Sequence, residues 1–163
     1  MAVLDTITTL LNRVLIALAG VFLVAMIGLT CANIVCRFLW VPLRGTFELM
    51  GFFGAVITAF ALAGAWVNGS HIAVDVLIHR YPKKLQSAAA VISNGLSMVF
   101  FGVAAWQITR WATTIRQTGE VTETLRIIYY PFIYAVAVGC AVLALVLLTA
   151  TIKVLCAPDR GEM

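Results

Sequence analysis

Four long stretches without a charged side chain in their interior dominate the sequence. They cover about residues 14–36, 47–67, 86–109 and 132–155. Each meets the requirement of roughly 20 apolar residues for a helix that crosses a hydrocarbon core of about 30 Å. The sequence therefore predicts an all-α integral membrane protein, with residues 1–163 forming a single membrane domain of four transmembrane helices.

Composition supports this fold class. Hydrophobic residues make up 63% of the chain and charged residues 11%, where a soluble domain has roughly half and a quarter. Such a chain cannot build a water-soluble shell. The connections are short, so we expect the function to reside in the helices and their loops.

The N-terminal stretch differs from the spans. Apolar residues recur at helical spacing between residues 3 and 15, opposite Asp5, Thr8 and Asn12, which predicts a short interfacial helix before the first span. The first basic residue is Arg13, and the apolar run after it is longer than that of a signal peptide. We therefore expect this segment to be retained.

Four spans place both termini on one side of the membrane. The ends and the second loop carry six basic residues and the opposite side carries five, so the count alone is nearly balanced. The tight cluster of Arg80, Lys83 and Lys84 favours cytoplasmic termini. The net charge of +4 is scattered, which predicts contact with membrane lipids and no nucleic acid.

The second span carries Gly51, Ala55, Ala59 and Ala63 at four-residue intervals. Small residues at this spacing let another helix approach closely. Two explanations remain open: packing among the four helices, which we favour, and packing against an external partner.

Several membrane activities are disfavoured by what the spans lack. Ion-coupled transport usually requires an ionisable group inside the membrane, which costs about 2.5–3.5 kcal/mol to insert and persists only for function. A four-helix multidrug exporter would need a carboxylate in the first span, which offers only Thr30, Cys31 and Asn33 near its end. We therefore do not expect this chain to transport protons alone.

Redox chemistry has equally little support. Cys31, Cys36, Cys140 and Cys156 lie within or at the ends of apolar runs, which predicts buried, unoxidised packing residues. Haem ligation would need histidines inside the spans, but the chain has only His71 and His79, both in the second loop. We expect no cofactor.

Two loop patterns leave alternatives open. His71, Asp75 and His79 recur every four residues and would share one face of a helix as metal ligands; the favoured alternative is an interfacial segment in this second loop. In the third loop, Arg116 and Glu120 have the spacing of an i,i+4 pair around Gly119; the favoured alternative is that these charges are solvated.

Two segments give the chain a family resemblance. They read NIVCRFLWVPLRGTFELMG after the first span and NGSHIAVDVLIHRYPKKLQ after the second. With the order of four spans, they resemble the small membrane subunit of tripartite ATP-independent periplasmic (TRAP) transporters, the DctQ-like family. Asn33, Arg37 and Phe38 match the end of that family's first helix, and Glu48 matches its acidic residue opening the second.

The resemblance implies a small, non-catalytic scaffold subunit in the bacterial inner membrane. Its partners would be a large TRAP membrane subunit that imports organic anions by sodium symport, and a periplasmic solute-binding protein. The candidate interface residues are Arg37, Arg44, Glu48, Gly51, Ala55, Ala59, His71 and Asp75. The alternative is a stand-alone membrane redox protein or enzyme that uses the loop histidines or the cysteines.

Overall fold

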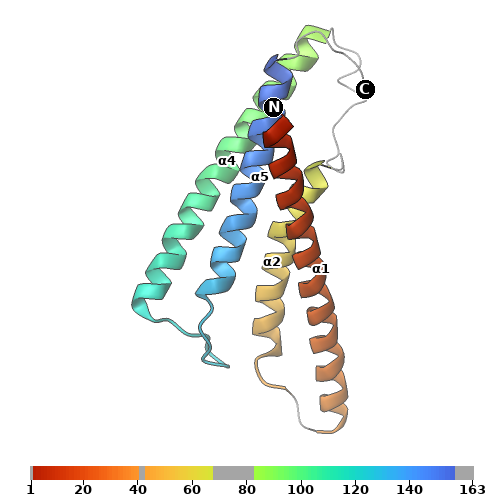
Figure 1. Ribbon diagram of the computed structural model, residues 1–163. Coiled ribbons are helices and arrows are strands. Elements are labelled where there is room, and N and C mark those ends of the chain that lie inside the picture. Colours follow the sequence, from red (N-terminus) through yellow and green to blue (C-terminus); the bar gives the residue numbers. More distant parts are fainter. Residues whose placement is uncertain (1, 41–42, 68–82, 157–163) are drawn as a thin grey trace.

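The computed structural model describes residues 2–40, 43–67 and 83–156, and they form four long helices (Figure 1). The helices are α1 (Ala2–Phe38), α2 (Thr46–Val67), α4 (Lys83–Thr118) and α5 (Tyr130–Cys156). All four are long and apolar enough to cross a membrane. The predicted all-α fold with four transmembrane helices is therefore confirmed.

Two helix boundaries differ from the expected ones. Helix α1 runs without a break through residues 3–15, so the short N-terminal helix is not a separate element but the first turns of α1. Helix α4 continues past Thr109 to Thr118, because arginine is a good helix former and its long side chain reaches polar surroundings. The interfacial segment expected in the second loop lies outside the described residues.

The end of α4 is set by Gly119, which has a φ of 69°. This left-handed conformation suits glycine and commonly ends a helix. Glu120 consequently lies beyond the helix, where it accepts a hydrogen bond from Tyr129, and it does not form the i,i+4 pair with Arg116 that their spacing allowed. Helix α5 then begins at Tyr130 with Pro131 in its first turn, where a missing backbone N–H is tolerated.

The helices follow one another in space in the order α1, α2, α5, α4. Helix α1 packs on α2, α2 packs on α5, and α5 packs on α4. Figure 1 shows the α1/α2 pair beside the α4/α5 pair, with the start of α1 and the end of α5 at the same end of the molecule. Within the spans, 44% of α5 is buried, against 11% of α1 and 6% of α4, so α5 is the central helix and α1 and α4 are the outer ones.

The main core joins α1, α2 and α5. Its buried members are Leu15, Ala19, Val56, Phe60, Ala63, Val142, Leu143, Val146 and Leu147. The backbones of α2 and α5 approach most closely where Gly139 faces Ala59, because a Cβ on Gly139 would lie 2.8 Å from the Ala59 carbonyl oxygen. In lipid the hydrophobic effect contributes little to the association of helices. Close van der Waals packing between small residues stabilises the α2–α5 pair instead.

Aromatic rings extend this core towards the loop that joins α4 to α5. Phe52 of α2 stacks on Phe132 of α5 and on Tyr129, with ring centroids 5.4 and 5.5 Å apart. Phe53 contacts Phe132 at 6.0 Å and Phe22 of α1 at 5.4 Å. Each such pair contributes about 0.5–1.5 kcal/mol beyond its buried area, so the rings connect three helices at this end.

Candidate functional site

The turn between α1 and α2 has a fixed geometry at its second half. Gly45 has a φ of 78°, and the buried Thr46 hydroxyl donates a hydrogen bond of 2.9 Å to the Leu43 carbonyl. An added Cβ on Gly45 would overlap the Leu125 side chain of the loop between α4 and α5. Because Gly45 has no side chain, Leu125 of this distant loop can pack directly against the turn.

The loop of residues 119–129, here called the outer loop, folds as a small hairpin. The Thr122 N–H donates to the Ile127 carbonyl at 3.1 Å, and the Arg126 N–H donates to the Thr122 carbonyl at 3.1 Å. The Thr122 hydroxyl, which is buried, accepts from the Ile127 N–H at 3.3 Å. These local bonds satisfy backbone groups of Thr122, Arg126 and Ile127 and close the hairpin.

Glu48 connects the outer loop to α2. Its Oε1 accepts the Thr124 N–H at 2.8 Å, and its Oε2 accepts the Leu125 N–H at 3.3 Å. The carboxylate also lies in the first turn of α2, where negative charge complements the helix dipole. The carboxylate proposed from sequence as a partner contact is thus already engaged within the chain.

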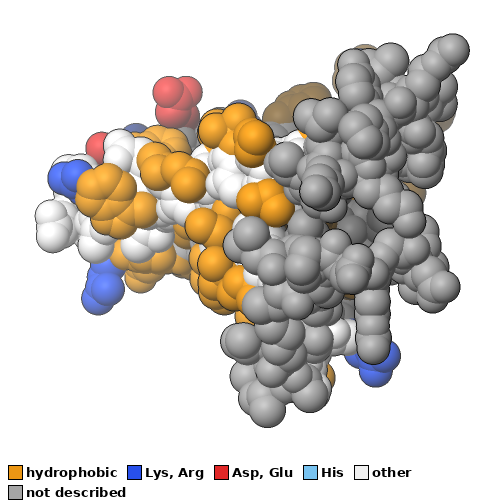
Figure 2. Space-filling model, turned by 90° about the horizontal axis from the view of Figure 1, so that it is seen from above, with side chains coloured by type: hydrophobic (Ala, Val, Ile, Leu, Met, Phe, Trp, Pro, Cys, Tyr) orange, Lys and Arg blue, Asp and Glu red, His pale blue; other side chains and the backbone are white. Residues whose placement is uncertain are grey.

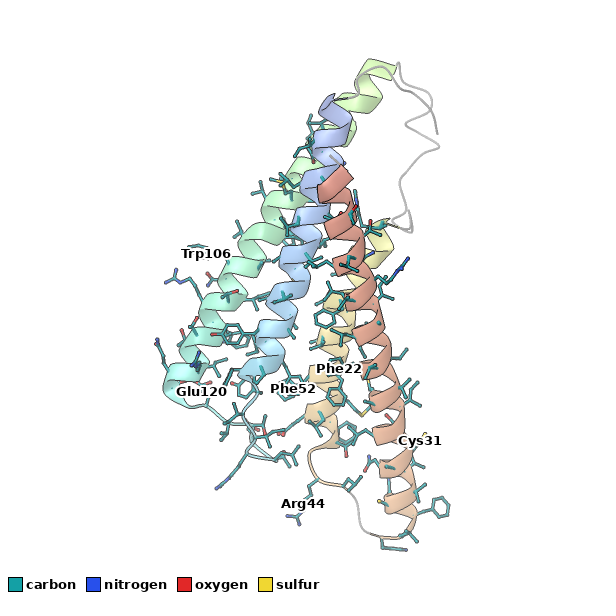
Figure 3. All side chains as sticks on the ribbon, viewed as in Figure 1. Phe22, Cys31, Arg44, Phe52, Trp106 and Glu120 are labelled. Carbon is teal, nitrogen blue, oxygen red and sulfur yellow. The ribbon has the colours of Figure 1, made fainter. Side chains whose placement is uncertain are left out.

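A second carboxylate, Glu120, is engaged inside the outer loop (Figure 3). The Tyr129 hydroxyl donates to Glu120 Oε2 at 3.0 Å. Burial of the phenol raises the pKa of Tyr129, and the hydrogen bond to the negatively charged carboxylate raises it further, because both disfavour the phenolate. This contact therefore favours the neutral phenol as a donor.

The two arginines of the candidate set are exposed. Arg37 occupies the last turn of α1, where a cation complements the helix dipole. Arg44 points away from the helices (Figure 3). Neither has a carboxylate partner among the residues that the structure describes, so both remain available to lipid headgroups or to another protein.

The small-residue stripe of α2 divides into two halves. Ala59 and Ala63 are buried, and Ala59 meets Gly139 of α5. Gly51 and Ala55 are exposed. The half nearer the centre of α2 therefore serves internal packing, and the half nearer Glu48 stays open.

An apolar groove lies beside this open half. It has a volume of about 250 Å³ and is lined from three helices, by Phe52 and Ala55 of α2, Ile108 and Trp111 of α4, and Phe132 and Val136 of α5, among others. The groove results from the helix order, because the described parts of α2 and α4 both pack on α5 and hardly on each other.

The remaining candidates divide between described and undescribed residues. Cys140 is buried as expected, but Cys31 is exposed (Figure 3), which corrects its expected role as a buried packing residue. Cys31 lies on a face of α1 that none of the other described helices covers. His71, Asp75 and His79 lie outside the described residues. Within residues 2–40, 43–67 and 83–156, no three potential metal ligands come together.

The fold and these surfaces define a multi-pass helical membrane protein whose outer helices are open and whose spans are free of charge in their interior. The family model described as "Tripartite ATP-independent periplasmic transporters, DctQ component" matches residues 26–157. The chain therefore belongs to this family and is a small membrane component of a TRAP transporter. Neither the comparison with curated proteins nor that with solved structures gives a match.

Proposed function

We propose that this chain is the non-catalytic scaffold subunit of a sodium-driven importer of organic anions. In this proposal it works with a large membrane subunit, which carries the solute and sodium, and with a periplasmic solute-binding protein. It lies in the bacterial inner membrane with both termini in the cytoplasm. Membership of the family supports the tripartite arrangement.

Two observations together support the scaffold role: the interiors of the spans carry no charge, and the outer helices have exposed apolar faces. A conduit for ions or organic anions needs polar groups within the membrane, but residues 14–36, 49–67, 85–109 and 127–152 contain no Asp, Glu, Lys or Arg. The outer helices α1 and α4 instead present apolar side chains such as Val24, Ile92 and Leu96. Helix α1 offers surface for lipid and for a partner helix, and α4 offers surface for lipid, while transport belongs to the larger subunit.

A scaffold has a physical use beside a transport domain that slides through the membrane. The sliding part needs a partner that stays in place, and four packed helices widen the hydrophobic area by which the fixed part is held in lipid. Figure 2, which views the molecule from above, agrees with such a body: on the part that is not grey, hydrophobic side chains predominate and the basic ones stand at the margins.

Arg37, Arg44 and Gly51 are the residues that we assign to the partner surface. All three are exposed and lie near the turn between α1 and α2, which the cytoplasmic termini would place at the periplasmic side. Glu48 and Ala59 contribute indirectly, because Glu48 holds the outer loop and Ala59 packs against α5. Ala55 lines the apolar groove. His71 and Asp75 stay candidates on the cytoplasmic side.

Co-purification tests the scaffold role and its surface together. The chain is expressed with the large membrane subunit, and the complex is recovered through a tag on the small subunit and assayed for solute uptake in vesicles. Gly51→Leu should lower both recovery and uptake, whereas Gly95→Leu on α4 is the matched control. A Cβ at either position meets no atom of the chain within 4 Å, so neither substitution disturbs internal packing at that atom.

The outcomes separate the two parts of the proposal. If the wild-type chain recovers no large subunit, the scaffold role is wrong. If the complex forms and both leucine variants retain it equally, the surface around Gly51 is not the interface. Charge reversal of Arg37 to Glu should likewise reduce recovery, through loss of a polar contact at the rim.

A further inference from the structure

Next to the apolar groove lies a second hollow of a different character. It has a volume of about 550 Å³ and is lined by Gln107, Ile108, Arg110, Trp111 and Thr114. Ile108 and Trp111 line both spaces, so the two hollows are neighbours. One is wholly apolar, and the other offers a guanidinium and an amide, since the Thr114 hydroxyl already donates to the Arg110 carbonyl at 3.1 Å. An apolar space beside a polar one suits an amphiphile.

Arg110 is set up to receive an anion. Its guanidinium carbon lies 5.2 Å from the centre of the Trp106 ring, a cation–π contact that fixes the plane of the group. No carboxylate pairs with it among the residues that the structure describes. The N–H groups along its edge therefore remain free for an oxyanion, and a planar fork of donors matches phosphate geometry.

The depth of Arg110 agrees with a phosphate at this position. It is the first charged residue after the uncharged stretch of residues 85–109, and Trp106 and Trp111 flank it at the level where aromatic residues gather in membrane proteins. In Figure 3 Trp106 projects outward from α4. The guanidinium thus lies at the boundary between hydrocarbon and headgroups, where phospholipid phosphates are found.

The geometry points to a binding site for one phospholipid molecule of the surrounding membrane, with its phosphate at Arg110 and an acyl chain in the apolar groove. The acyl chain occupies the groove between α2 and α4, over the surface of α5, and contacts Phe52, Ala55 and Val136. This site goes beyond the scaffold role, because it requires only the chain and the bilayer.

A helix of the large subunit is the competing occupant. A helix with side chains has a diameter of about 10–12 Å and could only lie over the groove, inserting single side chains. It would leave Arg110 without an anion unless it also carried a carboxylate at that depth. Phospholipid supplies the anion and the alkyl chain in one molecule and surrounds the protein.

Native mass spectrometry of the full-length chain in mild detergent tests the site. Phosphatidylglycerol and a diacylglycerol with the same acyl chains are titrated onto the wild type and four variants. Arg110→Gln should weaken phosphatidylglycerol binding by at least about tenfold and leave diacylglycerol unaffected. Ala55→Phe, which fills the groove, should weaken both. Arg116→Gln and Ala61→Phe, at exposed positions that line neither hollow, should change neither.

Each outcome decides the matter. Loss of phosphatidylglycerol from Arg110→Gln and of both lipids from Ala55→Phe supports the site, provided that the thermal unfolding of the variants matches the wild type. Equal binding by Arg110→Gln and Arg116→Gln would overturn it, as would unaltered binding by Ala55→Phe. If Ala55→Phe keeps the lipid in this experiment and loses the large subunit in the separate co-purification assay, the groove belongs to a partner helix. Failure here leaves the co-purification result unaffected, because no partner is present.

Discussion

Replacing Gly139 by alanine should separate α2 from α5. The new Cβ would lie 2.8 Å from the Ala59 carbonyl oxygen and 2.9 Å from its carbonyl carbon. Ordinary contact begins at 3.4 Å, so the two backbones must move apart by 3.4 − 2.8 = 0.6 Å. Because the obstacle is backbone, no rotamer change relieves it, and overpacking of this kind costs about 1–3 kcal/mol.

Gly95→Ala on α4 provides the control for that measurement. Both glycines lie inside long helices, where alanine gains roughly 0.5–1 kcal/mol over glycine. A Cβ on Gly95 meets no atom within 4 Å. The difference in unfolding free energy between the two variants therefore isolates the contact and should be about 1–3 kcal/mol.

Thermal unfolding in detergent, followed by circular dichroism, gives the comparison. At roughly 2–4 °C per kcal/mol for a chain of this size, Gly139→Ala should melt several degrees below Gly95→Ala. Equal melting temperatures would refute the reasoning, because they would mean that α2 and α5 do not touch at Ala59.

Two further outcomes concern the turn and the outer loop. Gly45→Ala should lower the unfolding free energy by about 1–3 kcal/mol more than Gly119→Ala, because both positions have positive φ but only Gly45 also faces a side chain that its Cβ would overlap; equal losses would contradict this. Glu48→Gln should speed trypsin cleavage after Arg126 in the detergent-solubilised protein, because one acceptor oxygen for the loop amides is lost. Glu123→Gln is the control, and equal digestion of the two variants would show that the carboxylate does not hold the loop.

The four spans could be predicted from sequence because the determining physics is local. A charge inside the hydrocarbon is costly wherever the chain goes, so long uncharged apolar runs identify membrane helices without knowledge of their neighbours. Helix ends were less predictable. The sequence predicts the end of the third span at Thr109, just before Arg110. A long cationic side chain can remain in a helix and reach the headgroups, however, and α4 ends only before Gly119.

The role of Glu48 could not be read from the sequence. Its partners are backbone N–H groups of Thr124 and Leu125, 76 and 77 residues away, and every residue except proline carries such a group. No residue type in the outer loop therefore signals the contact. A weak signal existed in Gly45, since a glycine just before a helix often allows a close approach.

The small-residue stripe shows the same limit in another form. Four-residue spacing places Gly51, Ala55, Ala59 and Ala63 on one face, and sequence alone offered internal or external packing for the whole face. The structure divides it, because α5 approaches α2 closely at Ala59, whereas Gly51 and Ala55 are exposed and Ala55 lines the groove. The close approach depends on Gly139, which lies 80 residues from Ala59 by numbering, 139 − 59.

The contacts at Gly139 and Glu48 have a mechanical consequence for the proposed scaffold. If the α1/α2 pair and the α4/α5 pair touched at only one point, they could rotate about that contact. A subunit that rotates internally would deform when a neighbouring domain slides past it. Here α2 and α5 touch backbone to backbone at Ala59 and Gly139, while Glu48 and Leu125 connect α2 to the outer loop at a second point. Stacked Phe52 and Phe132 lie between them. Two separated contacts oppose rotation about either one, so the chain meets a partner as one body, as bracing requires.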